Sequence, residues 1–134
     1  MNISSFDDLL QAARQQTEPQ RLLFVFVNAE LPEDSTQLQR ENFLNGQGGA
    51  LVPMMCVDKS PNELESFAEL LEESRQFGKE WSLVFAAAMT GSLGIVPSSE
   101  DAEKPLQRMV EAIKAGTLGS YIPFDRLGQA VNLH

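Results

Sequence analysis

The feature that most constrains the fold is a pair of short segments that are apolar at successive positions. The first runs from Leu22 to Val27, and the second runs from Leu83 to Phe85 within the stretch Trp81–Gly94. Segments that are apolar on both faces are typical of strands in the interior of a sheet. Gly91 and Gly94 follow the second segment and predict the loop in which that strand ends. We therefore expect both segments to lie in the middle of one sheet.

The rest of the chain predicts four helices and two further strands. Helical spacing of apolar residues, with polar caps, indicates helices over residues 5–16, 36–45, 61–76 and 98–115. Residues 50–57 and 121–131 have strand character, the latter as a short strand and a turn. Pro53 and Pro123 lie in these two strands. Because proline cannot donate to a ladder, we expect both strands at sheet edges or bulges.

The alternation of helices and strands, with long connections between the strands, predicts a three-layer α/β domain with a mainly parallel sheet. The two apolar strands in the middle and the proline-bearing strands at the edges give the strand order 2-1-3-4. The alternative is an α+β domain in which the C-terminal segment pairs antiparallel, as a strand or as a hairpin. With 134 residues and no internal repeat, we expect a single globular domain over 1–134.

A parallel sheet of this order predicts where a ligand would bind. Ligands in such sheets favour the crevice at the carboxyl ends of the strands, beside the point where the strand order reverses. That crevice would lie between residues 28–30 and residues 90–94. The candidate ligand-binding residues, chosen by position alone, are Asn28, Glu30, Thr90, Gly91, Ser92 and Gly94.

Residues that could perform catalysis are few. The single histidine is His134, the final residue, so a Ser-His-Asp or Cys-His mechanism is not expected. Cys56 is the single cysteine, which excludes an internal disulfide, and its apolar neighbours predict a small buried core residue. Glu30, Glu33 and Asp34 form an acidic loop that is typical of a solvated surface. We therefore expect no metal or cofactor and assign no catalytic residue.

The charge balance disfavours two classes of partner. Ten Lys and Arg residues face 19 Asp and Glu residues, which gives a formal net charge of −9, and no window concentrates the cations. Nucleic acids and anionic membranes both require a cationic surface. No apolar run approaches the ~20 residues that cross a bilayer. We expect a cytoplasmic protein that binds neither nucleic acid nor membrane.

Five segments carry a resemblance to a known family. They are Ser5–Leu10, Gln20–Phe26, Gly49–Lys59, Leu106–Gly116 and Pro123–Arg126. The chain resembles a family of small proteobacterial proteins of similar length that are often called ribonucleotide reductase subunit alpha. That name implies a radical-bearing cysteine and a separate reducing cysteine pair, and this chain has one cysteine. We interpret the name as a misannotation, and the resemblance implies no catalytic residue here.

Two hypotheses of function remain. The first is a non-catalytic cytoplasmic domain that works through protein–protein contact, with a partner or as a homodimer. The alternative is a small-ligand-binding domain, or an enzyme, that uses the crevice near residues 28–30 and 90–94.

Overall fold

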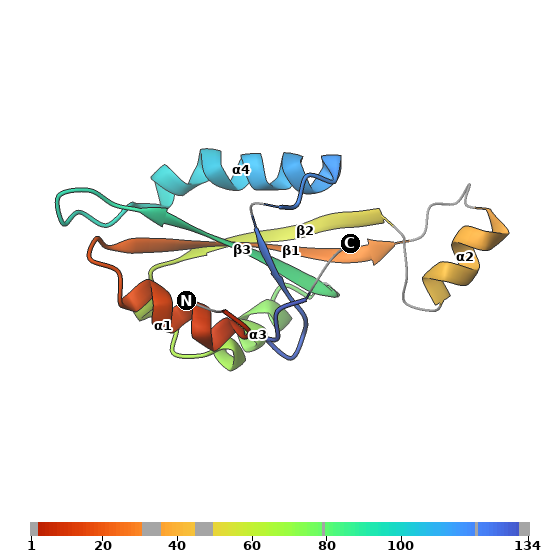
Figure 1. The fold of residues 1–134 in the computed structure, drawn as a ribbon, viewed down its shortest axis with the longest axis horizontal. Helices are drawn as coiled ribbons and strands as arrows, with labels where there is room; N and C mark the ends of the chain where they lie inside the picture. The colour runs from red at the N-terminus through yellow and green to blue at the C-terminus, as the bar shows by residue number, and fades with distance from the viewer. Residues whose placement is uncertain (1–2, 31–35, 45–49, 79, 120, 132–134) are drawn as a thin grey trace.

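A computed structural model describes residues 3–30, 36–44, 50–78, 80–119 and 121–131. Its framework is a four-stranded sheet in the order β2-β1-β3-β4 (Figure 1). The strands are β1 (Gln20–Glu30), β2 (Ala50–Lys59), β3 (Leu83–Thr90) and β4 (Ile122–Phe124). The helices are α1 (Phe6–Arg14), α2 (Gln37–Leu44), the 3-10 helix η1 (Pro61–Glu63), α3 (Phe67–Arg75) and α4 (Ser99–Ala115).

Every pair of neighbouring strands in this sheet is antiparallel, so the predicted mainly parallel sheet is wrong. The fold is α+β, although the order of neighbours is 2-1-3-4 as expected. A connection long enough to cross over a sheet is also long enough to return to the neighbouring position, and the alternation of elements does not distinguish the two. The β1–β2 and β3–β4 connections return in this way. β2 and β3, which flank β1, run parallel to each other, and β1 and β4, which flank β3, do the same.

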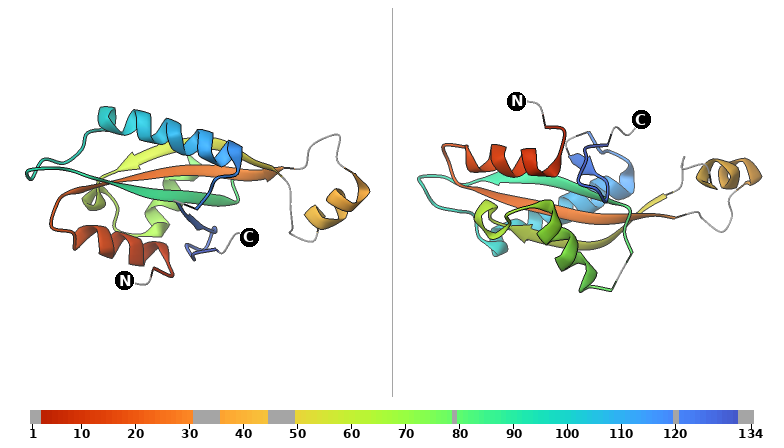
Figure 2. Two further views of the ribbon diagram at one scale, coloured as in Figure 1. Left: turned by 45° about the horizontal axis from the view of Figure 1, so that its top comes forward. Right: turned by 90° about the horizontal axis from the view of Figure 1, so that it is seen from below.

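Helices cover both faces of the sheet, with α1 and α3 on one face and α4 on the other (Figures 1 and 2). The alternation of side chains along β1 supplies both cores. Leu22, Phe24 and Phe26 belong to the core under α1 and α3. Leu23, Val25 and Val27 belong to the core under α4. All six are almost fully buried, which confirms that β1 is an interior strand.

The core under α1 and α3 is centred on Phe6, near the start of α1. Its ring centroid lies 5.3 Å from that of Phe24, 5.2 Å from that of Phe67 and 5.5 Å from that of Phe124. These rings come from the first helix, the central strand, the third helix and the last strand, so one aromatic cluster joins both ends of the chain. Such pairs contribute about 0.5–1.5 kcal/mol each beyond their burial.

The helix boundaries follow their caps. Ser5 and Asp8 form a capping box at the start of α1, as the sequence predicts. Ser98 and Asp101 do the same for α4, which ends at Gly116 in the left-handed conformation. The single helix expected over 61–76 is instead divided into η1 and α3, because the residue after η1, Leu64, is extended and buried.

The β2 strand lies at an edge of the sheet, as its proline predicts. Its register with β1 shifts between Phe26 and Val27, and Pro53 lies directly after this bulge. The prediction that Cys56 is buried is wrong, since its side chain is exposed. Met55 and Val57 pack against the core under α1 and α3. Alternation therefore turns Cys56 to the other face, at the margin of the sheet.

Candidate functional site

The structure does not bring the two halves of the predicted crevice together. Thr90 pairs with Gln20, at the beginning of β1, whereas Asn28 and Glu30 lie near its end. Ten residues of strand separate the two places, which amounts to about 30 Å at the usual rise of a strand. The crevice rested on parallel strands one and three, and in an antiparallel pair the carboxyl ends lie at opposite ends of the sheet.

Residues 90–94 form the end of β3 and a tight turn. The turn is closed by a hydrogen bond of 2.9 Å from the N–H of Ile95 to the carbonyl oxygen of Ser92. Both central residues have positive φ, 54° at Leu93 and 76° at Gly94. The N–H of Gly94 donates to the carboxylate of Glu18 at 3.3 Å, so an anion at this turn would compete with the protein's own carboxylate.

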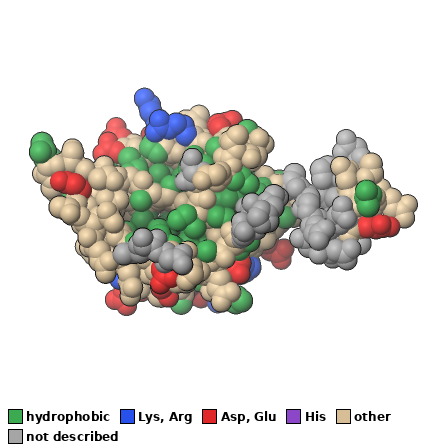
Figure 3. All heavy atoms as spheres, in the orientation of Figure 1, with side chains coloured by type: hydrophobic (Ala, Val, Ile, Leu, Met, Phe, Trp, Pro, Cys, Tyr) green, Lys and Arg blue, Asp and Glu red, His purple; other side chains and the backbone are tan. Residues whose placement is uncertain are grey.

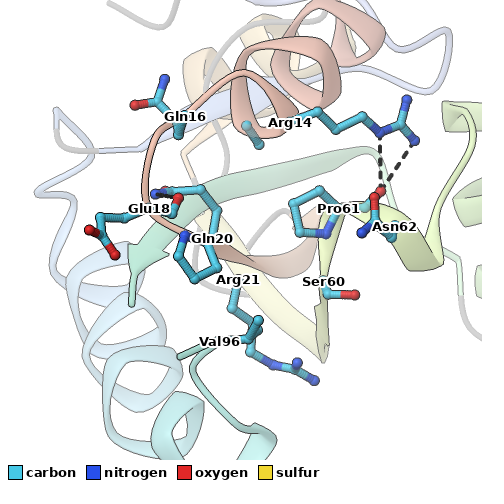
Figure 4. A pocket seen from close by; sticks show the side chains of 11 residues that line it. Arg14, Gln16, Glu18, Gln20, Arg21, Ser60, Pro61, Asn62 and Val96 are labelled. Carbon is cyan, nitrogen blue, oxygen red and sulfur yellow. Dashed lines mark hydrogen bonds between the residues drawn. The ribbon is translucent and has the colours of Figure 1, made fainter. Parts of the chain in front are cut away.

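A polar pocket of about 340 Å³ lies between the end of α1, the start of β1 and η1 (Figure 4). Arg14 reaches across it and donates to the carbonyl oxygen of Pro61 from Nε at 3.4 Å and from Nη2 at 3.2 Å. Its Nη2 also donates to the carbonyl oxygen of Leu64. These bonds tie α1 to the segment that follows β2.

The second arginine of this pocket, Arg21, is bound to protein groups in the same way. Its Nε donates to Oδ2 of Asp58 at 2.6 Å, and its Nη2 donates to Oγ of Ser99 at 2.7 Å. Ser99 in turn donates to Asp58 at 2.7 Å. Burial raises the pKa of Asp58, but the hydrogen bonds from Ser99 and Arg21 and the charge of Arg21 outweigh it and hold that pKa below its ordinary value. We interpret the pocket as a structural junction of α1, β1, β2 and α4.

Along the outer half of β3, no described strand pairs with the backbone polar groups on the side away from β1. β4 pairs only with Val84–Ala86, so Ala87–Thr90 form what we call the open edge of β3. Gly91 donates to the carbonyl oxygen of Pro19 at 2.8 Å. Because antiparallel partners alternate, the N–H and C=O groups of Ala88 and Thr90 point away from β1. Both residues are exposed, and no described strand pairs with them on that side.

Beside the open edge lies a hollow of about 420 Å³ between β3 and α4, which we call the β3–α4 groove. Its lining combines the polar residues Thr90 and Arg108 with apolar side chains: Leu23, Ala87, Met89, Pro105, Met109 and Tyr121. Figure 3 shows the apolar side chains gathered over β3 and β4, below α4. A second hollow of about 490 Å³ shares Met89 and Pro105 with the groove and extends it toward Ile95 and Val96. Together they form a trough along the open edge.

The two edges of the sheet differ in how they are protected. On β2, Pro53 lies opposite Val27, whose polar groups point toward β3, so the nitrogen of Pro53 faces outward. A proline and a bulge in the middle of an edge are common devices against unwanted strand pairing. The open edge of β3 has neither, and its two outward residues, Ala88 and Thr90, are small and uncharged. This contrast makes the open edge of β3 the less protected of the two.

The described residues offer little to a metal or to a membrane. Among them, no group of three His, Cys, Asp or Glu side chains could hold a metal ion. Glu33, Asp34 and His134 lie outside the described residues. No described helix combines the length and apolar character that a membrane span requires. Every buried side-chain nitrogen or oxygen in the described part has a hydrogen-bond partner.

Comparison with protein-family models, with curated proteins and with solved structures found no match. The family resemblance inferred from the sequence therefore stays a prediction. No matching protein shows whether the β3–α4 groove also occurs elsewhere. Sequence reasoning placed Thr90 near a site but missed Ala88, Met109 and Tyr121, because their grouping depends on the short length of β4. The available signal was the run Ala86–Ala88, which places small side chains in the half of the strand where Ala88 is exposed.

Proposed function

We propose that this protein is a non-catalytic cytoplasmic interaction domain that binds an extended segment of a partner protein. The segment adds as a strand to the open edge of β3 and lays alternate side chains in the β3–α4 groove. The observation that carries the proposal is the outward direction of the N–H and C=O groups of Ala88 and Thr90 beside an apolar trough. Strand addition uses these two components, because main-chain hydrogen bonds provide affinity and pockets for alternate side chains provide specificity.

The charge of the chain favours a foreign segment over a second copy. Each copy carries a formal net charge of −9, and like charges oppose the association of two copies. A short extended segment does not bring a second charge of that size to the edge. We therefore expect a monomer in solution, and a homodimer through the same edge is the competing outcome.

A small-ligand function has less support. The crevice that would have joined residues 28–30 and 90–94 is divided between the two ends of the sheet. In the polar pocket, Arg14 and Arg21 already donate to carbonyl, hydroxyl and carboxylate oxygens of the protein. A ligand there would have to replace these bonds, whereas a strand at β3 would use groups that face solvent.

The test is a selection of random peptides displayed on phage against the immobilised full-length chain, followed by hydrogen exchange of the complex. Bound peptides should slow exchange of the Ala88 and Thr90 amides. Ala88→Pro removes one outward N–H without breaking a bond to β1, so it should weaken binding by roughly tenfold while the fold is kept. Cys56→Pro is the matched control, since it removes an outward N–H from the β2 edge.

Three results would overturn the proposal. The first is a selection that yields no binding peptide. The second is a set of peptides that protect amides elsewhere or bind Ala88→Pro as well as wild type. The third is a dimer by light scattering that Ala88→Pro converts to a monomer, because the open edge would then belong to a second copy.

A further inference from the structure

Two cationic side chains stand beside the groove, and no described residue pairs with either of them. Arg108 lines both the β3–α4 groove and its extension, and Lys104 lines the extension. The two are four residues apart on α4, so they lie one above the other on the same side of the helix. Both are exposed, and within the described residues neither has a hydrogen-bond or ion-pair partner. Figure 3 shows cationic side chains above the apolar face.

The carboxylate that lines the trough with them is already bound. Asp101, one turn before Lys104, accepts a hydrogen bond from the backbone N–H of Ser98 at 3.0 Å. The backbone N–H of Asp101 donates to Oγ of Ser98 at 3.1 Å, so it also takes part in the cap. Asp101 therefore caps α4, and among the described residues its carboxylate forms no ion pair with Lys104 or Arg108.

The lining of the trough is richer in bases than the chain as a whole. Acids outnumber bases by 19 to 10 along the chain, yet the charged side chains lining the two hollows are two bases and one acid. Unpaired cations beside an apolar trough and an open strand edge complement a segment that is extended, partly apolar and acidic.

We propose that the segment bound in the β3–α4 groove carries an acidic side chain whose carboxylate binds Arg108, with Lys104 as the second cation. A strand added to β3 points alternate side chains toward α4. An Asp or Glu at one of these positions faces the side of the sheet on which Arg108 stands, and its apolar neighbours two residues away face the groove lined by Met89 and Tyr121. This inference rests on the proposed function, and it names the chemistry of the partner.

Two capped peptides test the inference directly. One alternates valine with aspartate, and the other has lysine in place of aspartate. We expect the aspartate peptide to bind the full-length chain and the lysine peptide to bind at least roughly tenfold more weakly, because an ammonium group is repelled by Arg108 and Lys104 and cannot accept their hydrogen bonds. Arg108→Gln should reduce binding of the aspartate peptide by roughly tenfold. Lys114→Gln is the matched control on the same helix, because Lys114 lines neither hollow.

The outcomes separate this inference from the function on which it rests. If the lysine peptide binds as tightly as the aspartate peptide and protects Ala88 and Thr90 from exchange, the acidic preference is overturned and strand addition stands. The same holds if Arg108→Gln and Lys114→Gln bind equally well. If phage selection yields peptides that protect neither amide, the proposed function fails and this inference fails with it.

Discussion

The N–H of Gly91 donates to the carbonyl oxygen of Pro19 at 2.8 Å, and this bond fixes the direction of the polar groups along the end of β3. With Gly91 turned toward β1, alternation turns Thr90 and Ala88 away from it. A shift of one residue would bury these groups in the ladder and expose those of Ala87 and Met89 instead. The open edge thus depends on a register that is anchored at the turn.

Gly91→Ala should weaken that anchor. A Cβ atom at this position would lie 2.0 Å from the carbonyl oxygen of Ile95, so the turn would have to move. We expect a loss of about 2 kcal/mol in the free energy of unfolding, measured by urea denaturation. At Gly119, where a Cβ would meet nothing within 4 Å, Gly119→Ala is the control and should change stability by less than about 0.5 kcal/mol. Equal effects would show that the contact with Ile95 is not what matters.

Asp58→Asn should lower the free energy of unfolding at neutral pH. It should also make that free energy depend less on pH in the acid range. Because hydrogen bonds and the charge of Arg21 lower the pKa of Asp58 in the folded state, its contribution is present above the unfolded value of about 3.9 and is lost as pH falls through the folded pKa. We expect Asp58→Asn to cost about 1–3 kcal/mol at neutral pH and to approach wild type near pH 2, measured by denaturant unfolding across pH.

Glu72→Gln is the control for this prediction. The ion pair of Glu72 with Arg75 is highly exposed on both sides, so the change should matter little at any pH. Asp8, Glu63 and Asp101 also have lowered pKa values, so part of the acid sensitivity will remain in Asp58→Asn. A constant difference from wild type between neutral and acid pH would contradict the assignment to Asp58 ionisation.

Cys56 should react with a thiol reagent in the native protein. Its side chain is exposed at the margin of β2, so modification needs no unfolding. The surrounding strand still desolvates the thiol in part and raises its pKa above the ordinary value. We therefore expect complete but slow reaction near neutral pH and faster reaction as pH rises above about 9. A native thiol that reacts only after urea is added would mean that Cys56 is buried.

The sequence was informative where a pattern depends on one element at a time. The continuous apolar character of Leu22–Val27 predicted an interior strand, and Pro53 predicted an edge, because both follow from what a strand requires of its neighbours. Strand direction was not predictable in this way. It depends on whether each long connection crosses over or returns, and residues such as Asn28 and Thr90 carry no signal of that choice.

The groove could not be predicted from the sequence, for a related reason. It exists because β4 contains only three residues and leaves Ala87–Thr90 without a described partner strand on the side away from β1. It also requires Arg108 and Met109, on α4, to lie beside β3, and no periodicity specifies which strand a helix covers. The prediction that Cys56 is buried was wrong for a similar reason. Side chains alternate between the two faces of β2, and at this edge of the sheet the side chain of Cys56 is exposed.

The outward-facing nitrogen of Pro53 sets a limit on stoichiometry. A sheet with two acceptor edges can join copies or partners into a growing array, whereas the β2 edge of this sheet is interrupted by Pro53 and a bulge. If the proposed function holds, a segment bound at β3 adds one strand to the sheet, and the β2 edge offers no second acceptor. We expect one partner segment per chain and a complex of fixed size, with no tendency toward filaments.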